Sequence, residues 1–321
     1  GQVDVCERIP GEDDEGVLAP GQEVADVAHS ARGPQQLLLL LVPPLVWFGV
    51  VYLGSLGALV WQSTYTFDDF AMTVSPTLTW ANYAKLLQAA NLDIVLRTVG
   101  MAGAVTIACA ALGFPIAYYM ARYARGGLKG FLYVAVMLPM WASYIVKAYA
   151  WTVILAKGGV VYWTLDLLGL VPALEAVLAL PVVGGSSLST SNLGRFLVFT
   201  YVWLPYMILP TQAAIERVPE NLLQASSDLG ARPGQTFRRV LLPLAFPGVV
   251  AGSIFTFSLT LGDYIIPQLV GPPGLQIGTM VYTLQGSVGN VPLAAAFTVV
   301  PIAIVSLYLV AARRLGAFDA L

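Results

Sequence analysis

Charged side chains are rare toward the C-terminal end of this sequence, and one carboxylate stands alone there. Asp263 is the only charged residue between Arg239 and Arg313. A carboxylate within a bilayer-spanning segment costs about 2.5–3.5 kcal/mol, so we expect this one to face a protein interior or a water-filled cavity. It could receive an ammonium group there, with Tyr264 adding a cation–π contact, or it could cap a helix or pair with Lys147.

A second polar feature is the segment 224–248, QASSDLGARPGQTFRRVLLPLAFPG, which separates two apolar stretches. Just before it, Pro219 suits a helix start and Glu220 the first turn, where the helix dipole favours an anion. Gly230 suits the position after the last turn, so the pattern predicts a helix of about two to three turns over 220–229. A second helix should continue after ARPG into the next apolar stretch. A short helix set between two membrane spans would act as a lever for a soluble motor.

Residues for other kinds of chemistry are sparse. Cys6 and Cys109 lie far apart, and His29 is the single histidine, so nothing suggests a metal site or a disulfide framework. No Ser stands in a Gly-x-Ser-x-Gly frame, and no Walker A sequence occurs, so any ATP hydrolysis needs another chain. We expect a non-catalytic protein. A net charge of −2 without a long basic run also argues against a nucleic-acid partner.

The composition indicates a protein that lies in a bilayer. Hydrophobic residues make up 57% of the 321 residues and charged residues only 11%, against about 25% charged in soluble domains. Six apolar stretches are long enough to span: 37–61, 99–120, 131–155, 196–215, 246–269 and 292–312. We therefore predict an all-α integral membrane protein with six transmembrane helices. Prolines inside the spans further predict a packed bundle, in which neighbouring helices satisfy the freed carbonyls.

Lysine and arginine predict the orientation of the spans. With the N-terminus in the cytoplasm, four lie in the outer segments and eleven in the inner ones, as the positive-inside rule expects. The eleven are Arg8, Arg32, Arg122, Arg125, Lys129, Arg217, Arg232, Arg238, Arg239, Arg313 and Arg314. Both termini and the segment 224–248 are then cytoplasmic.

The regions outside the spans differ in character. Residues 1–35 are acidic and rich in Gly and Pro, and we expect a disordered cytoplasmic tail. The segments 62–96 and 156–194 are long outer connections, and VYWTLDLLGL in the second predicts an amphipathic helix along the outer interface. These connections either cap the bundle or form a docking platform for a soluble external partner.

Several segments resemble bacterial ABC importer permeases. Gln224-Ala225-Ser226, Gly230, Val240 and Leu242-Pro243 resemble the EAA motif of that family, with Gln and Ser in place of the usual Glu and second Ala. The motif reads Glu-Ala-Ala, three residues, Gly, nine residues, Ile, one residue, Leu-Pro, and all its spacings fit. The segments MLPMWASYIVKAYAWTVIL and FTFSLTLGDYIIPQLVG are similar to the spermidine/putrescine type, and the order of motifs resembles its B-type subunit. The similarity covers about residues 36–315.

The resemblance implies a fold, a function and partners. The fold is the MetI-like transmembrane domain of type I ABC importers, over 36–321 with a core at about 95–312. The implied protein is a multi-pass permease of the bacterial inner membrane that imports polyamines by alternating access. Its implied partners are a second, C-type permease, an external substrate-binding protein, and an ATPase dimer that holds the ATP and Mg. Ferric iron, thiamine or an organic solute are alternative cargoes, and an ATP-independent secondary transporter is an alternative class.

Two sets of residues are expected to carry this function. The residues expected to couple to the ATPase are Glu220, Leu223, Gln224, Ala225, Ser226, Asp228, Leu229, Gly230, Ala231, Leu242 and Pro243. The residues expected to line the substrate path are Asp263, Tyr264, Trp141 and Tyr144.

Overall fold

A computed structural model describes residues 34–314, so the predicted acidic tail, with Cys6 and His29, lies outside the described residues. The chain divides into two compact units, Gly1–Leu59 and Val60–Leu321. The first holds one continuous helical stretch that ends a few residues beyond the boundary. Its parts are α2 (Pro34–Trp47), the π-helical η1 (Phe48–Leu53) and α3 (Gly54–Gln62). The portion Leu38–Gln62 has a mean hydropathy of 2.0 and the length of a membrane span.

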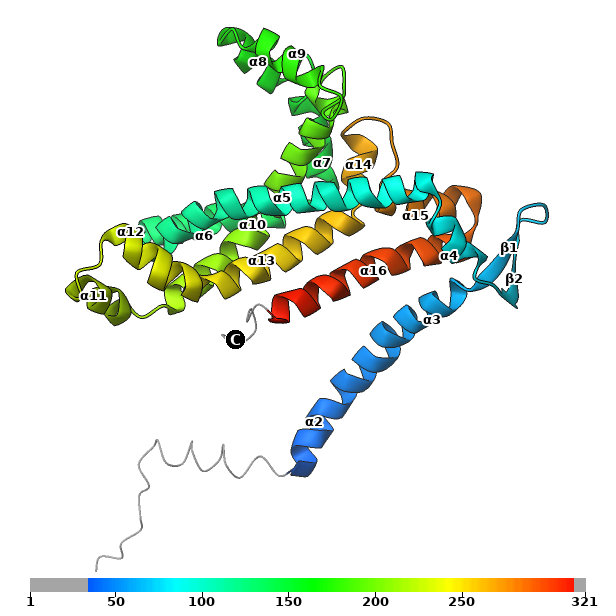
Figure 1. Ribbon diagram of the computed structural model, residues 1–321, viewed down its shortest axis with the longest axis horizontal. Coiled ribbons are helices and arrows are strands. Elements are labelled where there is room, and N and C mark those ends of the chain that lie inside the picture. The colour runs from blue at the N-terminus through cyan, green and yellow to red at the C-terminus, as the bar shows by residue number, and fades with distance from the viewer. Residues whose placement is uncertain (1–33, 315–321) are drawn as a thin grey trace, which may run out of the picture. The chain divides into compact units, whose positions relative to one another are not determined.

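The second unit is a bundle of long apolar helices (Figure 1). Its spans are α5 (Ala89–Arg122), α10 (Asn192–Arg217), α13 (Leu242–Gly262) and α16 (Val291–Arg314). Helix α10 packs against both α5 and α13, and its fully buried Phe199 and Met207 share a core with Val105 and Cys109 of α5. In the described part, five helices could each cross a membrane, or six if one bent pair counts as a span. The six predicted spans are therefore found.

The third span is broken, where the sequence predicted one stretch over 131–155. Helices α6 (Gly126–Trp141) and α7 (Tyr144–Ile154) meet at an angle of 95°. The Lys147 ammonium group donates a 2.8 Å hydrogen bond to the carbonyl oxygen of Pro139, in the last turn of α6. The alternative in which Lys147 pairs with Asp263 is therefore not found among the described residues, because the bend frees backbone carbonyls that the ammonium group satisfies.

The fifth span ends earlier than the predicted 246–269. Helix α13 stops at Gly262, and Asp263 has an extended backbone with ψ of 138°. The two carboxylate oxygens of Asp263 accept hydrogen bonds from the backbone N–H groups of Ile265 and Ile266, which open the short α14 (Ile265–Leu269). Asp263 thus lies just outside the span. The apolar run continues through the turn, so hydropathy alone does not mark the end of the helix.

The two outer connections contain structure of their own. The first holds an antiparallel hairpin, β1 (Tyr65–Asp68) and β2 (Thr73–Leu78), and then α4 (Ala81–Leu86). The side-chain amide of Asn82 joins α4 to the hairpin by donating to the carbonyls of Ser63 and Tyr65. The all-helical prediction misses this hairpin. In the second connection, the helix predicted in VYWTLDLLGL is present as α8 (Val160–Leu167), followed by α9 (Val171–Leu178), on an arm that projects from the bundle (Figure 1).

Two glycines let α13 lie directly on α10. A Cβ atom on Gly248 would come within 2.6 Å of the Pro210 carbonyl oxygen and 2.4 Å of the Ala214 Cβ. A Cβ on Gly252, one turn later, would lie 2.9 Å from the Cα of Met207. Small residues four apart are a common means of close backbone approach between membrane helices. The two helices are therefore expected to move together.

Candidate functional site

The predicted lever helix is present at one end of the bundle. Helix α11 covers Glu220–Asp228, nine residues or about two and a half turns. Gly230 has a φ of +80°, and its N–H donates to the Ser227 carbonyl at 2.8 Å, while the Ala231 N–H donates to the Ser226 carbonyl at 3.1 Å. This is the Schellman arrangement that ends helices at a left-handed glycine. The predicted helix length and the role of Gly230 are confirmed.

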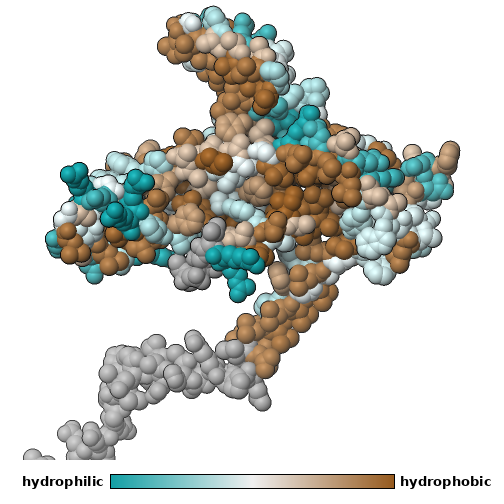
Figure 2. Space-filling view, in the orientation of Figure 1, coloured by the Kyte–Doolittle hydropathy of each residue, from teal (hydrophilic) through white to brown (hydrophobic). Residues whose placement is uncertain are grey.

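The chain then enters the fifth span through a tight connection. Helix α12 (Pro233–Thr236) and the π-helical η3 (Phe237–Leu241) run on into α13, whose first turn contains Leu242 and Pro243. The hydroxyls of Ser226 and Thr236 lie 2.9 Å apart and join α11 to α12. Figure 2 shows hydrophilic residues gathered over this end, while apolar residues cover much of the visible bundle.

One face of α11 is seated on the bundle. Leu223 and Phe237 pack against a buried cluster that includes Met120 of α5, Ile215 of α10 and Leu241. Beside them is a hollow of about 390 Å³ whose walls also include Glu220, Gln224 and Ala231. A tilt of α11 would therefore be felt by the ends of α5, α10 and α13 together.

The other face of α11 has no partner within the described chain. Ala225 and Asp228 are exposed, the Leu222 side chain is 45% exposed, and the Leu229 side chain is 89% exposed. An apolar side chain held almost entirely in solvent at a rigid helix end has no structural role in this chain. The predicted coupling residues therefore form two sets, one that contacts the bundle and one that is free to contact a second protein.

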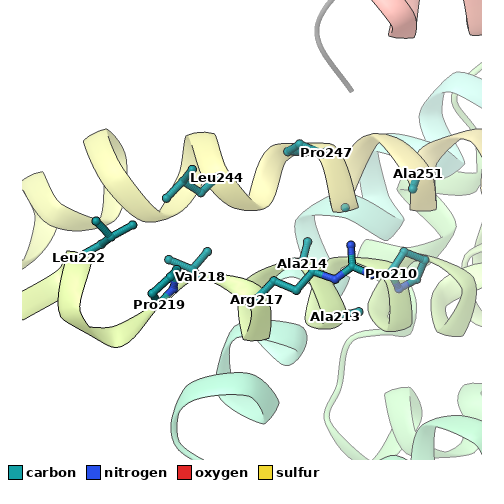
Figure 3. A pocket seen from close by; sticks show the side chains of 11 residues that line it. Pro210, Ala213, Ala214, Arg217, Val218, Pro219, Leu222, Leu244, Pro247 and Ala251 are labelled. Carbon is teal, nitrogen blue, oxygen red and sulfur yellow. The ribbon is translucent and has the colours of Figure 1, made fainter. Parts of the chain in front are cut away.

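An apolar groove with a volume of about 360 Å³ lies between the end of α10 and the beginning of α13 (Figure 3). Leu244, Pro247 and Ala251 of α13 line one wall, and Pro210 and Ala214 line the other. Leu222 closes one end of the groove, beside Val218 and Pro219 of the turn that leads into α11. The groove leaves open space beside Leu222, at the beginning of α11.

Arg122 is a residue of this site that the sequence analysis counted only as an inside charge. Its Nη2 donates to the carbonyl oxygens of Ile215 at 3.0 Å and Val218 at 2.8 Å, at the C-terminal end of α10. Close by, Lys129 forms a 2.8 Å salt bridge with Glu216. These contacts tie the end of α10 to α5 and α6. An arginine at the C-terminal end of a long span, near unpaired helix carbonyls, is the signal that could have found it.

A second candidate site lies near the other end of α13. Tyr264 stacks on Tyr282 of α15 (Ile277–Thr283) with ring centroids 5.1 Å apart and an interplanar angle of 10°. Their side chains are 39% and 51% exposed. Both line a cavity of about 310 Å³ that also contains Gln285 and Thr298. The cavity presents aromatic faces and an amide, which suit an organic cation.

The four predicted path residues are only partly brought together. The hydroxyl of Tyr144 lies near the Asp263 carboxylate, and its ring stacks on Trp203 of α10. Tyr264 follows Asp263 and lines the cavity. Trp141, at the end of α6, is 77% exposed and does not line that cavity. Tyr282 and Gln285 complete the site, and the sequence analysis missed them because only the fold brings α15 to the end of α13. No group of three His, Cys, Asp or Glu side chains that could hold a metal occurs in residues 34–314.

Comparison with known proteins places these features in a context. Residues 111–317 match the family described as the binding-protein-dependent transport system inner membrane component. The chain is 68% identical to the inner membrane ABC transporter permease protein YdcU of Escherichia coli K12, over 89% of this chain and 91% of that protein. It is 28% identical to the spermidine/putrescine transport system permease protein PotB of Salmonella typhimurium SL1344, over 84% of this chain and 89% of that protein.

The fold is also similar to a solved structure. A chain from the crystal structure of a bacterial ABC transporter involved in the import of the acidic polysaccharide alginate superposes with a TM-score of 0.65. The alignment covers 91% of this chain and 99% of that chain at 17% sequence identity. This likeness concerns the helical fold and confirms the predicted fold class.

Proposed function

This chain belongs to the family of inner membrane components of binding-protein-dependent transport systems, the permease subunits of ABC importers, and we propose that the solute it moves is a polyamine. Membership in this family excludes the alternative of an ATP-independent secondary transporter. Spermidine/putrescine permeases are among the relatives, at 28% identity over most of both chains, and their names support the polyamine proposal.

We further propose that α11 is the contact with a separate ATPase dimer, which binds ATP and Mg. The exposed Ala225, Asp228 and Leu229 would enter a groove on that partner, while Leu223 and Ser226 would transmit its movement to the bundle. A second permease would supply the other half of the path, and an external binding protein would deliver the solute. In this orientation, α11 and both termini face the cytoplasm of a bacterial cell.

The mechanism proposed for this arrangement is alternating access. Closure of the ATPase dimer on ATP draws the two coupling helices together and opens the path outward. The groove beside Leu222 and Leu244 gives α11 room to tilt, and the close contact at Gly248 makes α10 and α13 respond as one body. Hydrolysis then returns the path to its inward-open form.

One observation carries the choice of solute: the stacked and exposed pair of Tyr264 and Tyr282, adjacent in the chain to the lone Asp263. An ammonium group over an aromatic face gains about 0.5–2 kcal/mol, depending on its desolvation. A polyamine carries several such groups on an apolar chain, so one ammonium group can contact the tyrosine pair while another approaches Asp263, which precedes Tyr264 but does not line the cavity. An anionic solute would find no cationic partner among the residues that line this cavity.

The direct test is uptake by the assembled transporter in vesicles loaded with ATP. We expect accumulation of labelled putrescine or spermidine that requires the binding protein and ATP. Accumulation of thiamine or ferric iron under the same conditions, without polyamine uptake, would reject the polyamine proposal and leave the family assignment intact.

Replacing Asp263 with Asn is expected to raise the KM for polyamine about five- to tenfold, which corresponds to about 1–1.4 kcal/mol of lost attraction. The two N–H groups of Ile265 and Ile266 bond to different oxygens of Asp263, and Asn retains one oxygen for one of them, a role in which Asn and Asp are about equally good. Thermal stability should therefore change little. If the variant takes up polyamine with the same KM as the unaltered protein, the role of Asp263 is only to hold the start of α14.

A further inference from the structure

A cavity of about 720 Å³ lies at the end of the bundle opposite α11. Its walls are the beginning of α10, one face of α5, and the two loop segments Pro181–Gly184 and Pro272–Gln276. Irregular backbone of this kind is found outside the hydrocarbon core or along water-filled space. The cavity is therefore a feature of the aqueous end of the molecule, and neither the tyrosine pair nor the coupling helix contributes to it.

Arg195 brings a buried positive charge to this cavity. Its side chain lies in the first turn of α10, and the residue is only 4% exposed. Nε donates to the Val270 carbonyl and Nη2 to the Pro272 carbonyl, both at 3.0 Å. The Nη1 amino group has no hydrogen bond within the described residues, and no carboxylate forms a salt bridge with Arg195 there. The two carbonyl groups hold the guanidinium in place but do not neutralise its charge.

The surroundings of Arg195 are built to keep the guanidinium in this position. Gly271 has a φ of +110°, and a Cβ there would lie 2.5 Å from the Nε and Nη2 atoms of Arg195. At the rim, Arg97 is already paired with Asp93 at 2.8 Å, so this pair adds no net charge. The cavity is left with one uncompensated cation, and a buried charge without a partner is costly.

A second polar group in the same cavity also lacks a partner. Gln276 lines the cavity and is 3% exposed, and its Oε1 accepts no hydrogen bond within the described residues. The cavity thus offers guanidinium donors for an anion, and beside them lies a buried amide oxygen that lacks a donor within the described residues. An acidic residue in a polypeptide supplies both, because its carboxylate fits the guanidinium fork and its backbone supplies the N–H.

We propose that this cavity is a docking socket for an acidic side chain of the external substrate-binding protein. The inference rests on the proposed function, which places this end of the bundle outside the cell. The carboxylate binds Arg195 in the socket and neutralises its charge, and the Arg97–Asp93 pair remains at the rim. The socket helps to hold the binding protein on the permease before the solute is released.

The test uses the assembled transporter in nanodiscs of phosphatidylethanolamine and phosphatidylglycerol. ATPase activity is titrated with the purified binding protein of the same transport system. We expect Arg195→Gln to raise the concentration for half-maximal stimulation about 30-fold or more, the effect of losing one partner of a desolvated charge pair. ATPase activity without the binding protein should stay unchanged. Lys157→Gln removes an exposed charge at the same end and serves as the matched control, with a change within about twofold.

Two further variants separate docking from loop positioning. Gln276→Leu removes an amide whose oxygen makes no hydrogen bond within the described residues, so the fold should persist while docking weakens about fivefold, a loss near 1 kcal/mol. Arg195→Lys keeps the charge and should recover part of the stimulation. On the binding protein, acidic surface residues are neutralised one at a time. One of these substitutions should weaken the stimulation of the unaltered permease but cause no further weakening in the Arg195→Gln variant.

The outcomes are distinct. The socket would be overturned if the loss of every acidic residue of the binding protein added its full effect to that of Arg195→Gln. It would also be overturned if the Arg195→Gln and Gln276→Leu variants needed the same concentration of binding protein for half-maximal stimulation as the unaltered protein. A third result would also overturn it: the Arg195→Gln variant loses bound phosphatidylglycerol in native mass spectrometry while its stimulation by the binding protein is unchanged. The ligand of Arg195 would then be a lipid phosphate. If the unaltered transporter is not stimulated by the binding protein at all, the proposed importer partnership fails first and the socket with it.

Discussion

Leu229→Glu is expected to abolish uptake while the transporter still assembles in the membrane. Leu229 is 89% exposed and follows the last turn of α11, so a carboxylate there disturbs no contact within the described chain. In an apolar groove on the ATPase, the same carboxylate would lose its hydration without gaining a partner, which costs several kcal/mol. A loss of about 3 kcal/mol lowers the affinity about 150-fold. Solute uptake and co-purification of the ATPase measure this effect.

Two comparisons give the Leu229 result its meaning. Leu229→Met replaces leucine with an unbranched apolar side chain of similar size and is expected to transport at near the unaltered rate. Leu223→Arg, on the seated face of the same helix, should also stop transport but should lower thermal stability, because it places a charge against Met120 and Ile215. Normal uptake by Leu229→Glu would show that the exposed face of α11 is not the contact with the ATPase.

The second large effect is expected for Gly248→Val, in the contact between α13 and α10. Every rotamer of valine keeps the Cβ, which would lie 2.6 Å from the Pro210 carbonyl oxygen, a backbone atom that cannot rotate away. Overpacking costs about 1–3 kcal/mol when the surroundings relax and more when the obstacle is backbone. We expect little folded protein in detergent, a lowered midpoint of thermal unfolding, and no uptake.

The control for this contact is the same substitution on α5. Gly103 also lies inside a spanning helix, but a Cβ there meets no atom within 4 Å. Gly103→Val should therefore leave both the unfolding midpoint and the uptake near their unaltered values. Equal destabilisation by both variants would mean that valine is poorly tolerated in these helices generally, and that the α10–α13 contact has no special part.

Much of the coupling site could be predicted from the chain because its signals are local. The spacing of Gln224, Gly230 and Leu242-Pro243 carried the resemblance, and Gly230 ends α11 through its own left-handed backbone. Helix ends of this kind depend on residues within one turn of each other. The number of spans was predictable for a related reason, since hydropathy depends on composition along the chain.

The substrate path was less predictable because its residues meet across distant segments. Tyr282 reaches Tyr264 only through the fold of α15 onto the end of α13, and Trp141 leaves the predicted set because α6 ends there at a 95° bend. Asp263 was placed inside a span because the apolar run continues beyond Gly262. No local pattern distinguishes an apolar helix from an apolar turn that begins another helix.

The sequence by itself determined that this protein is a multi-span permease with a short helix after the fourth span, because span length and helix ends depend on neighbouring residues. Only the tertiary structure decided which face of α11 is exposed, that Arg122 holds the end of α10, and that Arg195 is buried in a cavity with Gln276, whose oxygen has no hydrogen bond within the described residues. Burial and the absence of a partner are properties of packed surroundings, and those surroundings come from segments far apart in the chain.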